Sequence, residues 1–359
     1  MAGTDKYDTQ NQSFEKRYVV QGDSPKEQTL AATGLSTILY AFDKKLKKDI
    51  VMKILNPFRE AKKGKERVRI PLEGAELESW QQRFLQEAEI TSQLNHNNIV
   101  NVYDFGIHRL PDRKLYYIIM DYVPGNDLQS AVRFVDTGKK SANPKKKLFV
   151  TYEEACLLFE EFCHPIGYAH KKNVIHRDLK LGNILVSKKG DFYICDFGLA
   201  KIKAGDGEES EKKAGDIDST AQITVENPVV TAEHTVLGTF EYITPEQIRG
   251  DPVSRRTDVY LMTAAFYHFL RGKPPFSSKD FDRRRYDNDH SFDMPKFPRG
   301  LKKIIAKGMQ VKPEHRFKSI QELQEAIREY RTRKPGLFSK APPEQRNLED
   351  ILKQLATAG

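Results

Sequence analysis

Three polar residues near the middle of the chain have the types and spacing for phosphoryl-transfer chemistry. Asp178 and Asn183 lie close together, and Asp196 follows after two short apolar runs at residues 184–186 and 192–195. A glycine-containing segment separates the runs, which predicts a β-hairpin that brings the three side chains to neighbouring loops. A carboxylate such as Asp178 can take the proton of an acceptor hydroxyl. Asn183 and Asp196 offer oxygen ligands for the magnesium ions that offset phosphate charge.

These residues stand inside two motifs. Residues 176–183 read His-Arg-Asp-Leu-Lys-Leu-Gly-Asn, and residues 196–198 read Asp-Phe-Gly. Either motif alone could be a coincidence or an ordinary turn, but both together, in this order and at hairpin spacing, resemble the protein kinase family. The resemblance implies an α+β, bilobal fold. A small, mostly antiparallel β N-lobe with one main helix would be joined to a larger α-helical C-lobe.

The resemblance covers residues 18–331, and the elements that must position the motifs follow from it. The N-lobe is expected at about residues 18–122, the C-lobe at about residues 126–331, and a long activation segment at residues 196–246. Residues 1–17 are polar and are expected to be disordered. An insertion loop is expected at residues 57–79 and a helix at residues 80–94. Residues 332–359 are expected to form a tail with a short amphipathic stretch at residues 348–355.

Lys53 is the lone cation in the alternating strand pattern of residues 49–55. Such a lysine is usually a solvent-facing spacer. The resemblance instead implies that it binds the α- and β-phosphates of ATP. The resemblance implies that its carboxylate partner is Glu87 in the predicted helix, and Glu89 is the competing candidate. The alternative for each is that it is an ordinary surface glutamate.

The apolar run at residues 115–120 predicts a buried strand that leads into a hinge. The resemblance implies that the backbone of Asp121 and Val123 binds adenine there, with Met120 at the inner edge of the site. A methionine in such a strand could equally serve core packing.

Residues 30–43 have the spacing of the family's nucleotide-covering hairpin but lack its glycines. The three expected glycines fall at Ala31, Thr33 and Ser36, whereas Gly34 is retained. The resemblance places Ala31 and Gly34 beside the phosphates. Glycines let backbone amides approach the phosphates closely, so the substitutions predict a weakened phosphate cradle.

Residues 238–246 read Gly-Thr-Phe-Glu-Tyr-Ile-Thr-Pro-Glu and resemble the family's peptide-docking segment. The resemblance implies that Lys180 supports the γ-phosphate and works with Thr239, which favours Ser/Thr over Tyr specificity. It also implies a buried ion pair between Arg316 and Glu246, because an uncompensated buried charge is costly. The greatest likeness is to bacterial Ser/Thr kinases.

Arg177 directly precedes Asp178 and predicts a point of control. In the family such an arginine commonly binds a phosphate on the activation segment, where a phosphothreonine would form charge-assisted hydrogen bonds. Thr235 is the leading acceptor and Thr231 the second. The alternative is that both are ordinary loop threonines and that Arg177 pairs with a carboxylate such as Glu233.

Composition limits the other classes of function. The chain has 359 residues, 38% of them hydrophobic, and no apolar run of about 18 residues that would predict a membrane span. Its polar N-terminus does not resemble a secretory signal, so a cytoplasmic location is expected. The net charge of +9 comes from lysines scattered in loop-like runs, and no nucleic-acid partner is expected. The three cysteines, Cys156, Cys163 and Cys195, are expected to be buried free thiols.

The resemblance therefore implies a Ser/Thr protein kinase that uses ATP with Mg²⁺, or with Mn²⁺ as the alternative ion. Its partner would be a protein substrate bearing Ser or Thr, and autophosphorylation in the activation segment is expected, with dimerisation for trans-autophosphorylation left open. A pseudokinase scaffold is the first alternative, motivated by the lost glycines. A kinase-fold enzyme acting on a small molecule is the second. The complete catalytic set argues against the first, and Lys180 with Thr239 argues against the second.

Overall fold

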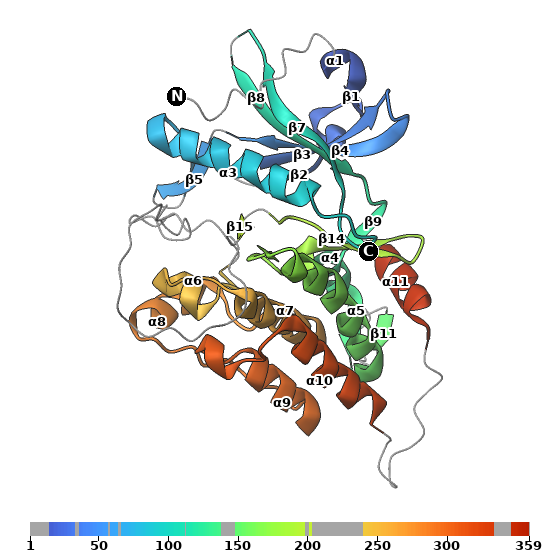
Figure 1. Ribbon diagram of the computed structural model, residues 1–359, viewed down its shortest axis with the longest axis vertical. Coiled ribbons are helices and arrows are strands. Elements are labelled where there is room, and N and C mark those ends of the chain that lie inside the picture. Colours follow the sequence, from blue (N-terminus) through green and yellow to red (C-terminus); the bar gives the residue numbers. More distant parts are fainter. Residues whose placement is uncertain are drawn as a thin grey trace.

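The computed structural model describes residues 14–32, 36–56, 58–63, 66–111, 113–137, 148–197, 201–202, 240–333 and 346–358. These residues form a small lobe built on a β-sheet and a larger helical lobe below it (Figure 1). The predicted α+β, bilobal fold is thus confirmed.

The N-lobe is built around one antiparallel sheet in the order β1-β3-β4-β8-β7, with β2 added beside β3. Helix α3 (Gly74–Ser92) packs against β7 and β8. Tyr117 and Ile119 of β8 point into one small core cluster, and Tyr116 and Ile118 point into a second under α3, because side chains alternate along a strand. The strands are β1 (Tyr18–Val20), β2 (Thr29–Ala32), β3 (Ser36–Asp43), β4 (Lys48–Leu55), β7 (Val102–Arg109) and β8 (Lys114–Asp121), and the short helix α2 (Pro25–Gln28) precedes β2.

The prediction of an insertion loop at residues 57–79 is wrong. Strands β5 (Phe58–Lys63) and β6 (Glu66–Pro71) form a separate antiparallel pair, and α3 already begins at Gly74. The charged composition concealed a hairpin whose main-chain groups bond to each other across the pair. It also concealed the first turn of α3, where Glu76 suits the positive end of the helix dipole.

The N-terminal segment also differs from its expectation. Residues 14–17 form the short helix α1 (Phe14–Arg17), while residues 1–13 lie outside the described part of the chain. Phe14 is buried and its ring stacks on His108 of β7 with a centroid distance of 4.3 Å. This apolar anchor, followed by the ion pair of Arg17 with Asp43, orders the segment despite its polar composition.

The C-lobe has one continuous core centred on α5 (Tyr152–Lys171) and α7 (Arg255–Arg271). Local signals define both helices: Thr151 and Glu154 form a capping box at the start of α5, and Gly272 ends α7 with a positive φ of 72°. The expected α-helical C-lobe is confirmed here, and Ser319 caps the start of α10. The other helices are α4 (Leu128–Ala131), α6 (Pro245–Arg249), α8 (Phe281–Tyr286), α9 (Arg299–Gly308), α10 (Ile320–Thr332) and α11 (Leu348–Thr357).

A three-stranded sheet lies between the lobes and carries the predicted catalytic hairpin. Strands β13 (Ile184–Ser187) and β14 (Phe192–Ile194) pair in antiparallel fashion through a turn in which Gly190 has a φ of 93°. Strand β9 (Gly125–Asp127) pairs with the other edge of β13. The hairpin therefore holds Asn183 and Asp196 at its two open ends. The remaining short strands are β10 (Val135–Thr137), β11 (Leu148–Val150), β12 (Val174–Ile175) and β15 (Lys201–Ile202).

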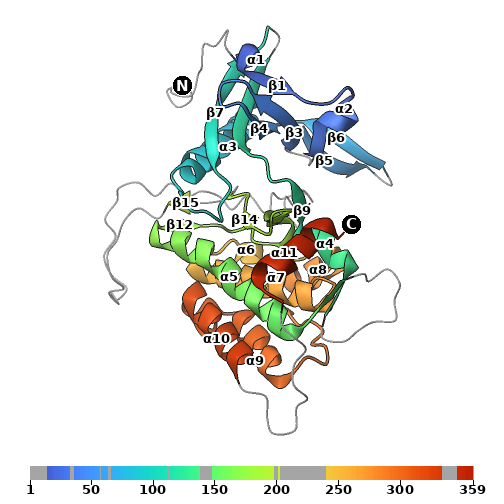
Figure 2. The ribbon, with the colours of Figure 1, turned by 90° about the vertical axis from the view of Figure 1, so that its right-hand side faces the viewer.

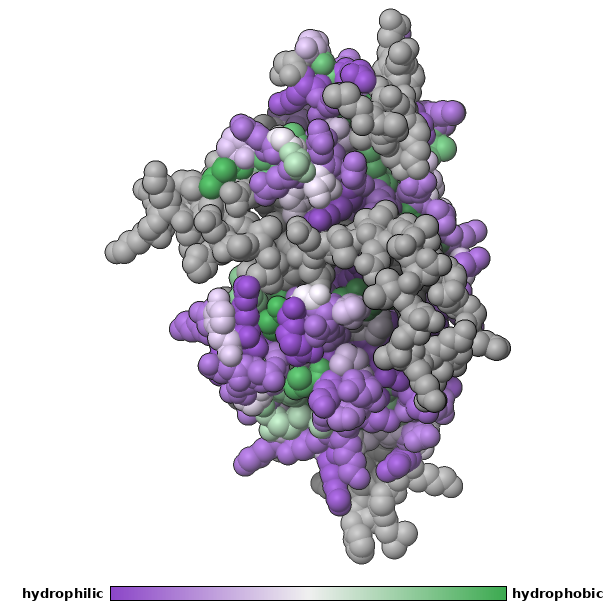
Figure 3. Space-filling view, turned by 60° about the vertical axis from the view of Figure 1, so that its left-hand side comes forward, coloured by the Kyte–Doolittle hydropathy of each residue, from purple (hydrophilic) through white to green (hydrophobic). Residues whose placement is uncertain are grey.

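The amphipathic stretch expected in the tail is confirmed as helix α11, which returns to the C-lobe beside α4 and α5 (Figure 2). Space-filling of one side shows a mainly hydrophilic described surface with hydrophobic side chains in small separate groups (Figure 3). None of the described helices is long and apolar enough to cross a membrane. Cys156 and Cys163 are buried free thiols as predicted, and Cys195 is free and partly buried.

Candidate active site

Lys53 of β4 joins two carboxylates that come from distant parts of the chain. Its Nζ lies 2.8 Å from Oε1 of Glu87 on α3 and 3.0 Å from Oδ1 of Asp196. The lysine side chain is only 10% exposed, because β4 runs in the middle of the sheet between β3 and β8. The structure therefore selects Glu87 over Glu89 as its partner and excludes the solvent-facing spacer.

Lys53 stabilises the charge of both carboxylates, but burial, together with the negative charge of Asp196, still raises the pKa of Glu87 above its ordinary value. Burial alone would lower the pKa of Lys53, but the negative charges of Asp196 and Glu87 raise it above its ordinary value. The positive charge of Lys53 in turn holds the pKa of Asp196 below its ordinary value. Lys53 and Asp196 are therefore both charged at neutral pH, which the predicted phosphate and metal binding would require.

The loop at residues 176–183, called the catalytic loop below, brings Asp178, Lys180 and Asn183 into one cluster. Lys180 Nζ lies 2.8 Å from Oδ2 of Asp178. Asn183 donates from Nδ2 to the backbone oxygen of Asp178 at 2.7 Å and to its Oδ2 at 3.2 Å. Asp178, Lys180 and Asn183 are thus held in contact, as the spacing predicted.

A buried aspartate fixes the backbone of this loop. Asp258 of α7 accepts hydrogen bonds from the backbone N–H groups of His176 and Arg177, both at 2.9 Å, and lies 2.7 Å from Nε2 of His170. Burial would raise the pKa of Asp258, but the hydrogen bond with His170, the nearby His176 and the backbone N–H of Arg177 lower it, so the carboxylate stays charged. Its signal in the sequence was a lone acid at the start of an apolar helix.

Asp196 is fixed from the hairpin side. The Cys195 N–H donates to the backbone oxygen of Asn183 at 3.0 Å, and the Cys195 carbonyl lies 3.0 Å from Nε2 of His176. Phe197 is buried with its ring 4.4 Å from that of His176. Asp196 itself has a φ of 59°, a left-handed conformation that turns its side chain toward Lys53.

The donor set of Asn183 and Asp196 fits magnesium. Asn183 uses its amide nitrogen toward Asp178, which leaves its amide oxygen for a cation. No cluster of three or more His, Cys, Asp and Glu side chains suited to a metal occurs in the described residues. Mg²⁺ typically takes one or two protein oxygens and completes its shell with water and substrate phosphates, so this sparse oxygen set suits it.

The hinge follows β8 as predicted. The Asp121 N–H donates to the Asn101 carbonyl at 3.1 Å, and its carboxylate is held by Lys48 at 2.9 Å and by the Asn101 side chain at 2.8 Å. Met120 lines a small cavity with Glu87 and Asp196, which places it at the inner edge of the site. Adenine binding by the backbone of Asp121 and Val123 stays a prediction.

The nucleotide-covering hairpin is described on both sides of its tip. Ala31 is exposed in β2 and pairs with Ile38 of β3, next to an irregularity in register. Ser36 is buried at the start of β3, opposite Leu55. Thr33 and Gly34 lie outside the described residues.

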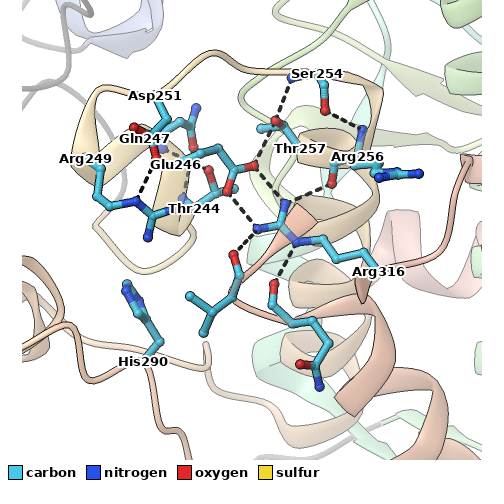
Figure 4. A network of polar contacts seen from close by, with 12 residues as sticks. Thr244, Glu246, Gln247, Arg249, Asp251, Ser254, Arg256, Thr257, His290 and Arg316 are labelled. Atoms are coloured by element: carbon cyan, nitrogen blue, oxygen red, sulfur yellow. Dashed lines mark hydrogen bonds and ion pairs between the residues drawn. The ribbon is translucent and has the colours of Figure 1, made fainter. Parts of the chain in front are cut away.

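The predicted buried ion pair of the peptide-docking segment is confirmed (Figure 4). Arg316 donates from its two terminal nitrogens to the two carboxylate oxygens of Glu246, each at 2.7 Å. Thr257 of α7 donates to Glu246 at 2.9 Å. Burial would raise the pKa of Glu246, but Arg316 lowers it below its ordinary value. Thr239, expected to work with Lys180, lies outside the described residues.

Sequence reasoning missed two residues that hold this segment. Gln247 donates from its side chain to the Arg177 carbonyl at 2.9 Å and so joins α6 to the catalytic loop. Arg284 is fully buried on α8, where its guanidinium donates to the carbonyls of Phe240 and Ile243. The run of three arginines in α8 resembled a solvated surface, and only the helical spacing from the buried Phe281 would have placed Arg284 on the inner face.

Arg177 is a partly buried cation with φ of 70°. Burial lowers the pKa of its guanidinium, and Asp258 only partly offsets this. Its Nε is buried and has no hydrogen-bond partner among the described residues. The residues proposed to meet it, Thr231, Glu233 and Thr235, lie outside that part of the chain.

A family model described as protein kinase domain matches residues 34–327. Serine/threonine-protein kinase PknB of Mycobacterium tuberculosis (strain ATCC 25618 / H37Rv) is 29% identical over 296 residues, covering 81% of this chain and 40% of that protein. Serine/threonine-protein kinase PrkC of Bacillus subtilis (strain 168) is 26% identical over 259 residues, covering 68% of this chain and 33% of that protein. This chain therefore matches less than half the length of these curated relatives.

Proposed function

This chain belongs to the protein kinase domain family, and from that premise we propose that it is a Ser/Thr protein kinase that transfers the γ-phosphoryl group of ATP to protein hydroxyls. The observation that carries the proposal is the junction of two clusters. The Lys53, Glu87 and Asp196 triad adjoins the Asp178, Lys180 and Asn183 cluster through the Asn183 to Cys195 bond. The bacterial relatives agree with the predicted lineage.

Each residue has a role that its surroundings support. Lys53, held by Glu87, would bind the α- and β-phosphates, while Asp178 would orient the acceptor hydroxyl and take its proton. Lys180 would support the transferred phosphoryl group from beside Asp178. Asn183 and Asp196 would hold Mg²⁺, which supplies neutralisation of the charge on the phosphates when bound.

Acceptor specificity depends on Lys180 and the docking segment. Lys180 contacts Asp178, so a cation lies where an acceptor hydroxyl would meet the phosphate. The residues from Phe240 to Glu246 are held by buried bonds to Arg284 and Arg316, which favours a docked peptide over a small molecule. Thr239 as partner of Lys180, a Ser/Thr-bearing protein substrate and dimerisation for trans-autophosphorylation stay predictions, as does the cytoplasmic location.

Transfer can be tested directly. Purified full-length protein should be incubated with γ-labelled ATP, Mg²⁺ and a protein rich in Ser and Thr, followed by identification of the phosphorylated residues. With Mg²⁺ we expect label on Ser or Thr. Transfer should be weaker with Mn²⁺, and there should be none without a divalent ion. Label on Tyr alone would contradict the Ser/Thr assignment, and nucleotide binding without any transfer would favour the scaffold, which the lost glycines motivate.

We also propose that phosphorylation of the activation segment controls the enzyme. The support is Arg177, whose buried Nε has no hydrogen-bond partner in the described part of the chain. A phosphothreonine at Thr235, or at Thr231, would supply the missing anion. Peptide mapping after incubation with ATP should find phosphate there, and Thr231→Ala/Thr235→Ala should lower activity. Full activity of that variant, with no phosphate between residues 201 and 239, would contradict the switch.

A further inference from the structure

Helix α11 lies beyond the region that matches the family model, which ends at residue 327. It nevertheless belongs to the main core of the C-lobe. Ile351, Leu352 and Leu355 are each at most 1% exposed and pack in the same cluster as the side chains of α5 and β13. The helix thus covers a surface of the C-lobe that would be apolar without it.

The start of this segment is attached to α5 by charge. Arg346 forms two 2.8 Å bonds to the two carboxylate oxygens of Glu154, and it donates to the Phe149 carbonyl at 2.6 Å. The Glu154 side chain is only 4% exposed, so its carboxylate is largely removed from solvent, whereas Arg346 is 26% exposed. Asn347 then caps the helix by accepting from the Asp350 N–H at 2.8 Å.

The other end of α11 is attached to the strand that follows the hinge. Asn126 of β9 donates from its side-chain amide to the Ala356 carbonyl at 3.0 Å and to the Ala358 carbonyl at 3.4 Å. The last carbonyls of a helix have no partner within the helix, so Asn126 caps them. Asn126 stands between the hinge and Asp127, the N-cap of α4, and its strand pairs with β13 at Val186.

The first turn of α11 lies on the turn of the catalytic hairpin. A Cβ atom at Gly190 would lie 2.5 Å from Cγ and 2.9 Å from the carbonyl oxygen of Glu349. Gly190 joins β13 and β14, whose other ends lead to Asn183 and Asp196. One helix therefore contacts both main-chain elements that border the nucleotide site, the strand after the hinge and the catalytic hairpin (Figure 2).

We propose that α11 contributes to nucleotide binding by holding β9, the strand after the hinge, in its binding position. Asn126 is the positioning residue through which the helix acts. The proposal rests on the proposed function, because it assigns this place to ATP. Asn126 and Ala356 are 230 residues apart in the chain, so the C-terminal segment and the hinge are coupled only through the fold. Changes that displace α11 should weaken nucleotide binding more than peptide binding.

The test uses full-length variants. Leu355→Asp places a charge in the core and should displace α11, while Asn126→Ala removes only the cap. Affinity for a non-hydrolysable ATP analogue with Mg²⁺ is measured by calorimetry, together with KM for ATP and for a peptide. We expect affinity to fall about tenfold for Leu355→Asp and about fivefold for Asn126→Ala, with KM for the peptide little changed. Thr357→Ala, on the exposed face of α11, is the matched control and should bind like the wild type.

The double variant separates positioning from general loss of stability. If Asn126 acts through α11, its removal adds nothing once Leu355→Asp has displaced the helix, so the double variant should match Leu355→Asp. Independent, additive effects would overturn the role of Asn126. Unchanged analogue affinity in Leu355→Asp, with hydrogen exchange showing residues 348–357 unprotected, would overturn the role of α11.

Two further outcomes are informative. If Leu355→Asp fails to fold, Asn126→Ala decides: unchanged analogue affinity together with increased exchange at residues 348–357 would overturn the proposal. Because calorimetry needs no turnover, the proposal can fail separately from the proposed function. A wild type that binds the analogue but transfers no phosphate contradicts the kinase and leaves this comparison valid.

Discussion

Two walls of the proposed nucleotide site are built in opposite ways. The first, here called the anchored wall, is formed by the catalytic loop and the β13–β14 hairpin. Buried bonds tie it together, and Asp258 and His176 hold its backbone. The second, here called the weak wall, is formed by the β2–β3 hairpin. It has a four-residue edge strand, an irregular register and an exposed Ala31 where the family has glycine. In the proposed function, chemistry and metal binding would depend on the first wall, whereas the second would contribute only to binding of the phosphates.

Under the proposed function, this contrast would explain how the enzyme tolerates the lost glycines. Transition-state stabilisation requires preorganised groups, and these are the ones that the buried network fixes. Contacts made equally to bound ATP and to the transition state affect KM without changing turnover. Substitutions in the two walls should therefore separate into effects on turnover and effects on affinity.

Asp196→Asn should lower both turnover and nucleotide binding, because it changes the anchored wall at the expected metal site. It removes a charged metal ligand and one of the two carboxylates beside Lys53. We expect turnover to fall on the order of 10²- to 10³-fold, with weaker binding of the nucleotide and metal, because a preorganised charge at the transferred group is lost. Steady-state kinetics and calorimetry with Mg²⁺ would measure both. Normal nucleotide affinity would contradict the assignment of Asp196 to the metal.

Arg316→Gln should show how strongly buried charge anchors the docking segment. Removing one partner of this pair should lower the free energy of unfolding by about 3–5 kcal/mol near neutral pH. Arg249→Gln, in the exposed pair of Arg249 with Asp251, is the matched control and should cost at most about 1 kcal/mol. Urea unfolding provides the measurement, and equal losses in the two variants would contradict the anchoring role.

The ion pair of Arg316 with Glu246 also predicts that the free energy of unfolding depends on pH. Arg316 lowers the pKa of Glu246 in the folded state. The stabilisation is therefore complete above the unfolded pKa of about 4.3 and is lost as pH falls through the folded pKa. The difference between the wild type and Arg316→Gln should shrink below about pH 4. A difference independent of pH would show that the charge of Glu246 is not what the arginine compensates.

Restoring glycine at Ala31, Thr33 and Ser36 should have the smallest effect, confined to the weak wall. Closer approach of backbone amides could add one net hydrogen bond to the phosphates, worth about 1 kcal/mol or roughly a fivefold decrease in KM for ATP. Turnover should stay unchanged. Ala32→Gly, at the neighbouring exposed position of β2, controls for added flexibility. If ATP binding does not improve, the hairpin covers the phosphates by another geometry or does not cover them.

The sequence predicted those parts of the molecule whose signals are local. The β13–β14 hairpin follows from its apolar runs and turn glycine, α11 follows from its amphipathic stretch, and Glu87 and Arg316 follow from motif intervals. The β5–β6 pair was missed because its charged residues resemble a loop. Arg284 was missed because burial of one arginine in a run depends on what packs against α8. The cap by Asn126 joins residues 230 apart, and no local pattern reports such a contact.

The central claim is that the anchored wall carries out phosphoryl transfer with Asp178 as the base. The most direct measurement is turnover of γ-labelled ATP by the wild type and by Asp178→Asn, alongside the affinity of each for an ATP analogue with Mg²⁺. The account predicts a loss of turnover of about 10²- to 10⁴-fold with nearly unchanged affinity, because the carboxylate acts on the acceptor and does not hold the nucleotide. Substantial retained turnover in Asp178→Asn would contradict it.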